Sequence, residues 1–136
     1  MQLMYYLETD RSLCNDQYGF RPKSQTTHVV HKLLNIIQAN SIKDEVTIVT
    51  FLDLSKAFDC LQYDKLFFKM EKLGFESHTI EWFRSYLSQR KQLTDIDGTT
   101  SSWLDMELGV PQGSILGPIL FLIYVCLLYT SPSPRD

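Results

Sequence analysis

The stretch TFLDLSKAFD, residues 50–59, restricts the fold of this chain more than any other part of its sequence. The residues before it, Glu45–Val49, are mostly β-branched and apolar, which favours a buried strand over a helix. We therefore expect a strand that runs into the carboxylate of Asp53. Because an unpartnered buried charge is too costly to keep, Asp53 needs a hydrogen-bond donor or a metal ion. On this stretch alone, a carboxylate that caps the turn is the favoured interpretation.

A second stretch, LGVPQGSILGP at residues 108–118, is rich in glycine. Gly109, Gly113 and Gly117 allow the backbone to approach a ligand closely, and Gln112 offers both a donor and an acceptor. A glycine-rich turn before a helix can also cradle a phosphate in an unrelated nucleotide-binding protein. The Gly-Lys-Ser/Thr ending of a P-loop is missing, so this loop alone is a weak signal. A small phosphate-binding protein stays open as an alternative.

These two stretches and the upstream segment Gln17–Pro22 (QYGFRP) resemble, in this order and separation, three motifs of reverse transcriptases. They are most similar to the enzymes of non-long-terminal-repeat (LINE-type) retrotransposons and more distantly to those of group II introns. The resemblance covers residues 5–125. It implies an α+β fold: a partial fingers–palm of a right-hand polymerase, with a small antiparallel sheet and helices packed on one face. It also implies RNA-templated DNA synthesis, with an RNA template, a DNA primer, deoxynucleoside triphosphates and Mg²⁺.

The resemblance assigns roles to individual residues. Asp53 matches the catalytic carboxylate that holds Mg²⁺ for two-metal nucleotidyl transfer, and the backbone carbonyl of Leu54 is a further expected ligand. Phe58 matches the aromatic residue under the nucleotide sugar, whose bulk disfavours a ribose 2′-hydroxyl. Gln112 and Gly113 match the loop that packs against the nascent base pair. Without the family, Phe58 is simply a core aromatic residue after a strand.

Two further polar residues have an ordinary interpretation beside the functional one. Arg21 matches an arginine that approaches the template or the incoming nucleotide, and its planar guanidinium suits phosphate oxygens. Alone, it is a solvated charge in a turn. Asp59 matches an acid that these enzymes often carry, but its spacing from Asp53 does not demand a shared metal. We assign Asp59 a local structural role.

One block of the family is not found in this sequence. It is an aromatic-Ala-Asp-Asp hairpin that supplies a second catalytic carboxylate, whereas the only acid after Ser114 here is Asp136. We therefore expect the isolated chain to synthesise no DNA, and a non-catalytic nucleic-acid-binding remnant is the alternative function. Residues 126–136 resemble translated sequencing-adapter sequence. We assign residues 1–125 to a partial reverse transcriptase domain and expect the native sequence to end near Val125.

Composition sets broad limits on the class of protein. The 136 residues are 44% hydrophobic and carry 13 basic and 16 acidic side chains, so the net charge of −3 argues weakly against a nucleic-acid-binding domain. Three widely spaced cysteines favour a reducing, intracellular setting, nuclear or cytoplasmic. The apolar run Ile115–Tyr129 is shorter than the roughly 20 residues of a membrane span, so we expect a buried helix and no membrane partner. No protein partner can be inferred.

Periodicity and turn residues predict the remaining elements. His28 and His31 are expected on a helix surface, since no third metal ligand lies nearby. The aromatic residues of the two helices in the middle of the chain are interpreted as core rather than as a base-stacking platform. The predicted elements are a helix from Thr26 or Thr27 to Asn40, a helix from the Asp64 cap to Gly74, a helix from Ser77 with Ile80, Phe83 and Leu87 on one face, strands at 92–96 and 103–108 joined by the polar link 97–102 with Asp97-Gly98 as its hairpin signal, and a helix over 115–125.

Overall fold

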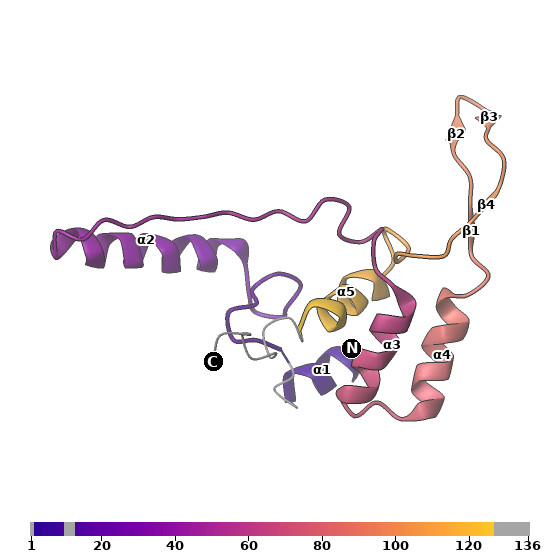
Figure 1. Ribbon diagram of the computed structural model, residues 1–136, viewed down its shortest axis with the longest axis horizontal. Helices are drawn as coiled ribbons and strands as arrows, with labels where there is room; N and C mark the ends of the chain where they lie inside the picture. The colour runs from indigo at the N-terminus through magenta and orange to yellow at the C-terminus, as the bar shows by residue number, and fades with distance from the viewer. Residues whose placement is uncertain (1, 10–12, 127–136) are drawn as a thin grey trace. The chain divides into compact units, whose positions relative to one another are not determined.

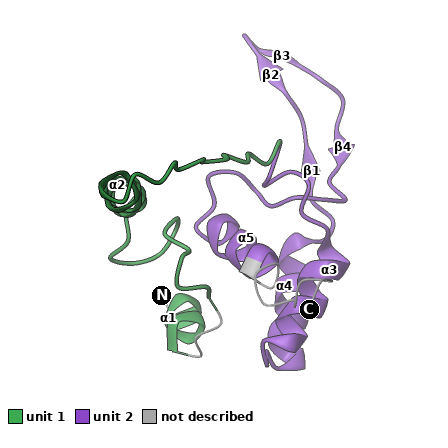
Figure 2. Cartoon of the chain, turned by 60° about the vertical axis from the view of Figure 1, so that its left-hand side comes forward, with its two compact units in different colours: residues 1–55 green, residues 56–136 purple. Residues whose placement is uncertain are grey.

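The computed structural model describes residues 2–9 and 13–126 of the chain. Within them it contains five helices and four short strands, which agrees with the predicted α+β class (Figure 1). The chain divides into two compact units, residues 1–55 and residues 56–136, which are described separately below (Figure 2). The expected tail at residues 126–136 lies outside the described residues except for Cys126.

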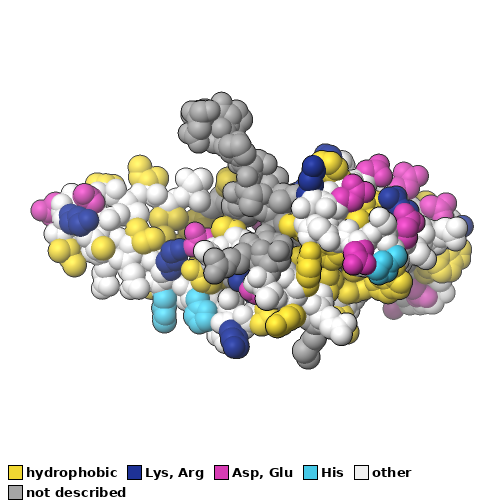
Figure 3. All heavy atoms as spheres, turned by 90° about the horizontal axis from the view of Figure 1, so that it is seen from below, with side chains coloured by type: hydrophobic (Ala, Val, Ile, Leu, Met, Phe, Trp, Pro, Cys, Tyr) yellow, Lys and Arg dark blue, Asp and Glu magenta, His cyan; other side chains and the backbone are white. Residues whose placement is uncertain are grey.

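The first unit contains helices α1 (Gln2–Thr9) and α2 (Thr26–Ile42). The residue before α2 is Gln25, whose backbone N–H donates to Nδ1 of His28 at 3.3 Å, so the predicted threonine caps are instead the first helical residues. No residue of α2 is buried, and hydrophobic side chains lie exposed along it (Figure 3). The exposed ones are Val29, Val30, Leu34, Ile36, Ile37 and Ile42.

The prediction of a buried strand at Glu45–Val49 is wrong. Residues 45–54 form neither helix nor strand, and Val46, Ile48 and Leu52 are about nine-tenths exposed. The sequence has the β-branched residues that a strand favours, but a strand is stable only when a neighbour pairs with its backbone. All strands of the described residues lie between Lys91 and Asp105 and pair with one another. Asp53 consequently lies in an exposed extended segment.

The second unit has a helical core. Helix α3 (Tyr63–Lys72) packs against both α4 (Ser77–Leu87) and α5 (Leu116–Cys126). The predicted face of α4 is confirmed, because Ile80, Phe83 and Leu87 are all buried. The side chains that fill the core around them are Leu61, Leu66, Phe67, Met70, Leu73, Val110, Leu120, Leu122, Ile123 and Val125.

The ends of these helices follow from local hydrogen bonds. Helix α3 ends as predicted at Gly74, which has a φ of 77°. The N–H of Gly74 donates to Glu71 O and that of Phe75 donates to Met70 O, the paired bonds of a Schellman motif. The N-cap residues lie before the predicted caps: Gln62 caps α3, two residues before Asp64, and Glu76 caps α4, one residue before Ser77.

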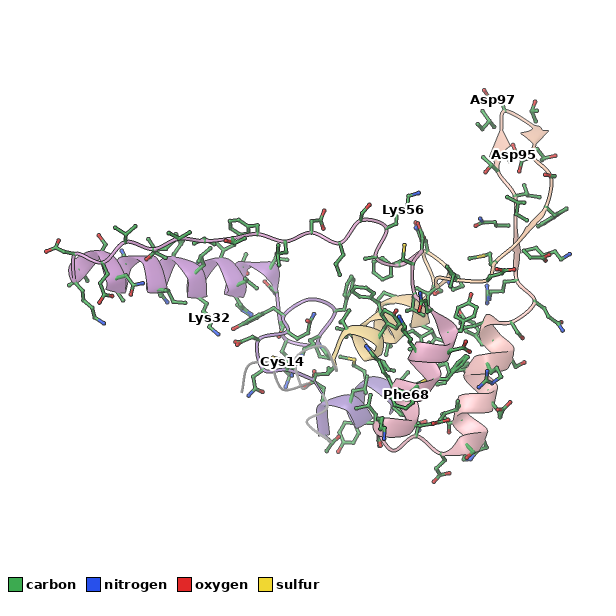
Figure 4. The ribbon with its side chains drawn as sticks, in the orientation of Figure 1. Cys14, Lys32, Lys56, Phe68, Asp95 and Asp97 are labelled. Carbon is green, nitrogen blue, oxygen red and sulfur yellow. The ribbon has the colours of Figure 1, made fainter. Side chains whose placement is uncertain are left out.

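Residues 91–105 form a long hairpin made of two short ladders. Strand β1 (Lys91–Gln92) pairs with β4 (Leu104–Asp105), and β2 (Asp95–Ile96) pairs with β3 (Thr99–Thr100). The predicted hairpin signal at Asp97-Gly98 is confirmed: both residues have positive φ, 51° and 81°, as a type I′ turn requires. The predicted link of residues 97–102 is too long, because Thr99–Thr100 forms β3. Figure 4 labels Asp95 and Asp97 at this tip.

The expected packing of helices on one face of the sheet is not seen in the described residues. Every residue of the four strands is exposed. The apolar residues of the unit instead bury one another between helices. Helix α5 is the buried helix that the apolar run predicted, and no helix among residues 2–9 and 13–126 has the length and apolar character needed to cross a membrane.

Candidate nucleotide-binding site

The end of the first sequence motif, from Lys56 onward, meets the glycine-rich loop in the second unit. Lys56–Cys60 forms a tight turn in which the N–H groups of Asp59 and Cys60 both donate to Lys56 O, at 2.9 and 3.1 Å. This turn positions Phe58, whose ring lies 4.8 Å from that of Phe121 on α5, measured between centroids. Phe58 is half-buried. Phe58 thus packs against the helical core, as expected of a core aromatic residue, and it is not among the residues that line the pocket described below.

The glycine-rich loop is held against this turn by backbone hydrogen bonds. Gly109 N donates to Leu61 O at 2.8 Å, and Val110 N donates to Phe58 O at 2.9 Å. Gly109 has a φ of 84°, and a Cβ atom there would come within 2.9 Å of backbone atoms of Phe58 and Asp59. Only glycine fits without a shift of the neighbouring backbone. The loop and the turn are thus one structural element.

The end of the loop starts α5. The Ser114 hydroxyl donates to Pro111 O at 2.7 Å and accepts from Gly117 N at 3.0 Å. The buried Gly117 leaves little room, because a Cβ there would lie 3.1 Å from Pro111 O. Gly113 is different, since it has a φ of 80° but nothing within 4 Å of a built Cβ. The positive φ of the turn favours glycine at position 113, whereas no neighbouring atom excludes a side chain there.

A pocket of about 570 Å³ opens where the turn, the loop and the hairpin meet. Across it, Nε2 of Gln112 donates to Oδ1 of Asp59 at 2.8 Å. Lys56, from the turn that precedes α3, also lines this pocket, and its side chain is exposed (Figure 4). The lining residues are Lys56, Asp59, Gln92, Met106, Leu108, Val110, Pro111 and Gln112. An ammonium, a carboxylate and an amide beside apolar groups can bind a small polar molecule that carries phosphate and donor groups.

Asp53 and Leu54 lie in the first unit, in the exposed segment that ends before Lys56. Within the described residues, the Asp53 carboxylate makes no hydrogen bond or ion pair. An exposed carboxylate needs no protein partner because water solvates it. The structure therefore brings Phe58 and Gln112 into one unit, with Gly113 next to Gln112, and it places Asp53 and Leu54 in the other.

Arg21 is engaged within the first unit. Its Nε and Nη2 bind the two carboxylate oxygens of Glu8 at 2.8 and 2.6 Å, and Nη1 donates to Cys14 O at 2.8 Å. The hydrogen bond from Arg21 holds the pKa of Glu8 below its ordinary value, and the same bond raises the pKa of Arg21. Sequence reasoning did not find this pair, because Glu8 lies in a helix outside the three motifs.

Comparison with known proteins decides the family. A profile of the family described as reverse transcriptase (RNA-dependent DNA polymerase) matches residues 2–131, nearly the whole chain. The chain belongs to the reverse transcriptase family. The resemblance drawn from the three motifs, to enzymes of non-long-terminal-repeat retrotransposons, is thereby confirmed.

Curated relatives come from mobile elements of Drosophila. The chain is 36% identical over 118 residues to a probable RNA-directed DNA polymerase from transposon BS of Drosophila melanogaster. It is 33% identical over 117 residues to the RNA-directed DNA polymerase from mobile element jockey of Drosophila funebris. The matches cover 85% and 86% of this chain but only 13% of each relative. The reverse transcriptase segment seen here thus spans about an eighth of the length of these relatives.

The residues of this reverse transcriptase segment fit part of a Mg²⁺ site. Mg²⁺ is usually held by one or two carboxylates together with water and phosphate oxygens, so the Asp53 carboxylate and the Leu54 carbonyl are suitable donors. A two-ion site needs further carboxylates. Among residues 2–9 and 13–126, no cluster of three or more His, Cys, Asp or Glu side chains could hold a metal ion. In agreement with the sequence, His28 and His31 are exposed residues of α2.

The aromatic residues of α3 and α4 divide between two environments. Phe67 and Phe83 are core residues, as predicted, but Phe68 and Trp82 are more than half exposed. The Trp82 ring stacks on that of Tyr86, with 5.7 Å between centroids and planes 3° apart. The Arg90 guanidinium lies 4.5 Å from the Tyr86 ring. The interpretation as core was therefore right for only part of the set.

Lys56 and Gln92 are the site residues that sequence reasoning missed. Lys56 lies inside the first motif, three positions after Asp53, and its charge next to an expected nucleotide site was the available signal. Gln92 gave no such signal. It reaches the pocket because β1 begins the hairpin that returns the chain to the glycine-rich loop.

Proposed function

We propose that this chain forms the nucleotide-facing part of a retroelement polymerase that copies RNA into DNA. The observation that supports this most directly is the pocket in which the turn at Phe58 and Asp59 and the loop at Gly109–Gln112 are hydrogen-bonded to each other. Both belong to sequence motifs of the reverse transcriptase family. The pocket offers Lys56 for phosphate oxygens and Gln112 for donor or acceptor groups of a nucleotide.

The residues of the chain have distinct roles in this proposal. Asp53 and the Leu54 carbonyl would hold Mg²⁺, which supplies activation of a primer 3′-hydroxyl and stabilisation of the leaving phosphate oxygen. Phe58, fixed by its contact with Phe121, limits the space under the nucleotide sugar and so disfavours a ribose. Gln112 and Gly113 face the base pair that forms. The partners are an RNA template, a DNA primer and deoxynucleoside triphosphates.

Arg21 requires a rearrangement to take part. Three of its nitrogen atoms already donate to Glu8 and Cys14, and its side chain is only 17% exposed. A template phosphate can bind Arg21 only by replacing the Glu8 carboxylate in the same bidentate geometry. We therefore propose that Arg21 first ties together Glu8 and Cys14, and that contact with nucleic acid is its second role.

The test is primer extension on an RNA template in the presence of Mg²⁺. We expect the isolated polypeptide to give no product, because Asp136 is its only acid after Ser114 and one carboxylate does not complete a two-ion site. A longer polymerase that contains this segment should extend the primer, and Asp53→Asn should reduce extension by at least a thousandfold. Asp64→Asn, at an exposed acid on α3, is the matched control and should leave extension unchanged.

Two results would contradict the proposal. If the longer protein still extends the primer after Asp53→Asn, Asp53 is not a ligand of the catalytic metal. Extension by the isolated polypeptide, abolished by Asp53→Asn, would show that the chain completes its metal site without a second motif acid.

A non-catalytic nucleic-acid-binding role is the second candidate. It is supported by the exposed Trp82 stacked on Tyr86 with Arg90 against the same ring, an arrangement on which unpaired bases can stack. Binding to a primer–template that weakens with salt, unaccompanied by synthesis in any longer form of the protein, would favour this role. Binding of nucleotide that is insensitive to template would instead favour a simple phosphate-binding protein.

A further inference from the structure

The side chain of Gln112 has a defined orientation in the pocket. A carboxylate can only accept hydrogen bonds, so the atom of Gln112 that lies 2.8 Å from Asp59 Oδ1 must be the amide nitrogen. The other end of the amide, Oε1, is then the group that remains for a ligand. Gln112 by itself could present either end, because its amide can rotate by half a turn. The hydrogen bond to Asp59 fixes one of these two orientations, with Nε2 toward the carboxylate.

The backbone around this pair leaves it little freedom to separate. Asp59 lies in the turn closed by two hydrogen bonds to Lys56 O. Gln112 follows Val110, whose N–H binds Phe58 O, and Gly109 sits so close to Asp59 that a Cβ atom would overlap with it. The backbones of two residues 53 positions apart in the sequence are thus held close together, and this keeps their exposed side chains within hydrogen-bond distance.

We propose that Asp59 is a positioning residue for Gln112. It holds the amide nitrogen, so that Oε1 is presented as an acceptor to a hydroxyl or amino group of a nucleotide in the pocket lined by Lys56. The inference rests on the proposed function and deepens it, since it states which chemical groups the pocket accepts. Asp59 therefore does more than the local structural role that its spacing from Asp53 suggested.

Two substitutions separate positioning from a simple tether. Asp59→Leu removes every acceptor while keeping a similar shape. Asp59→Asn keeps a hydrogen bond but no longer decides its direction, because an asparagine amide can donate to Gln112 Oε1 as well as accept from Nε2. If Asp59 only holds Gln112 in place, Asp59→Asn keeps that function. If Asp59 also fixes the direction of the Gln112 amide, Asp59→Asn loses it. Asp105→Asn is the control, since Asp105 is an exposed acid of β4 that pairs with Lys91 outside the pocket.

The first measurement is the NMR signal of the Gln112 side-chain amide in the ¹⁵N-labelled 136-residue chain, identified by its loss in Gln112→Ala. We expect its two protons to be separated from those of solvated glutamines in the original chain and in Asp105→Asn. In Asp59→Leu they should move to the solvated position. An unchanged signal in Asp59→Leu would show that the hydrogen bond does not form in solution, which would overturn the inference.

The second measurement is the affinity of the same chain for dTTP in magnesium buffer, from titration of the Gln112 and Gly113 signals. We expect Asp59→Asn to weaken binding about twofold relative to the same substitution made in Gln112→Ala, because only one of the two amide orientations then presents Oε1 to the nucleotide. Loss of a negative charge beside a triphosphate would by itself strengthen binding, so the charge effect has the opposite sign.

The outcomes distinguish this inference from the proposed function. An effect of Asp59→Asn on dTTP affinity that is the same with Gln112 and in Gln112→Ala would be a charge effect alone, and it would overturn the positioning role while leaving the nucleotide site in place. No binding of dTTP by the original chain would remove the nucleotide site itself, and the positioning role would fall with it.

Discussion

Replacing Gly109 by alanine should destabilise the unit of residues 56–136 much more than the same replacement at Gly113. Both glycines have positive φ, 84° and 80°, and both lie in the same loop. They differ in their surroundings. A Cβ on Gly109 would lie 2.9 Å from Asp59 Cα, Asp59 O and Phe58 O, whereas a Cβ on Gly113 would meet nothing within 4 Å.

The difference in free energy of unfolding can be estimated from these contacts. An alanine in the left-handed region loses about 1–2 kcal/mol relative to its preferred conformation, and this applies equally at both positions. The reduced entropy of the unfolded chain also applies to both, so it cancels in the comparison. The additional overlap at Gly109 involves backbone atoms that cannot rotate away, and overpacking of this kind costs about 1–3 kcal/mol. Gly109→Ala should therefore be less stable than Gly113→Ala by that amount.

Urea unfolding followed by tryptophan fluorescence measures the difference. Both tryptophans of the chain, Trp82 and Trp103, belong to the unit of residues 56–136, so the signal reports on it. With a slope of about 1–3 kcal/mol per molar urea, the two midpoints should differ by roughly 1 M. If Gly109→Ala is unfolded without urea, sucrose in all samples raises the midpoints into the measurable range. Equal midpoints for the two variants would refute the close approach of the loop to the turn.

Two further predictions concern the stability of each unit. The hydrogen bond from Arg21 lowers the pKa of Glu8, so its stabilising effect is present above the ordinary glutamate pKa and is lost as the pH falls through the lowered value. Hydrogen exchange of residues 13–21 should therefore quicken on acidification, and Glu8→Gln should make it fast at neutral pH. Equal exchange with and without Glu8 would contradict the pair. Phe83→Ala should lower the free energy of unfolding by about 3–5 kcal/mol, because Phe83 is only 4% exposed. Phe68→Ala should lower it by under about 1 kcal/mol, because Phe68 is 57% exposed. Similar urea midpoints for the two variants would argue against the helical core.

The sequence predicted well those features that depend on nearby residues. The face of α4 follows from apolar residues three and four positions apart, and the Asp97-Gly98 turn follows from the left-handed conformation that this pair tolerates. The end of α3 at Gly74 has the same local origin. In each case the deciding hydrogen bonds and contacts join residues that are close in sequence, so the local sequence pattern is enough to predict the feature.

Features that depend on distant partners could not be predicted in this way. The segment Glu45–Val49 has the composition of a strand but lacks a partner among the described residues, and composition does not reveal whether a partner is present. The bond between Asp59 and Gln112 joins residues whose spacing follows no periodic pattern. The Glu8 carboxylate on Arg21 is a third case, since any nearby acid could have paired with that arginine.

The exposed hairpin is a position at which residues can be inserted into this chain. Its tip at Asp97-Gly98 lies in open space, with no atom within 4 Å of a Cβ built on Gly98, so extra residues there disturb only a short ladder. An extra residue between Gly109 and Gln112 would instead move the amide away from Asp59. Inserted tags and natural length variation should therefore be tolerated at the hairpin tip and rejected in the loop that follows it.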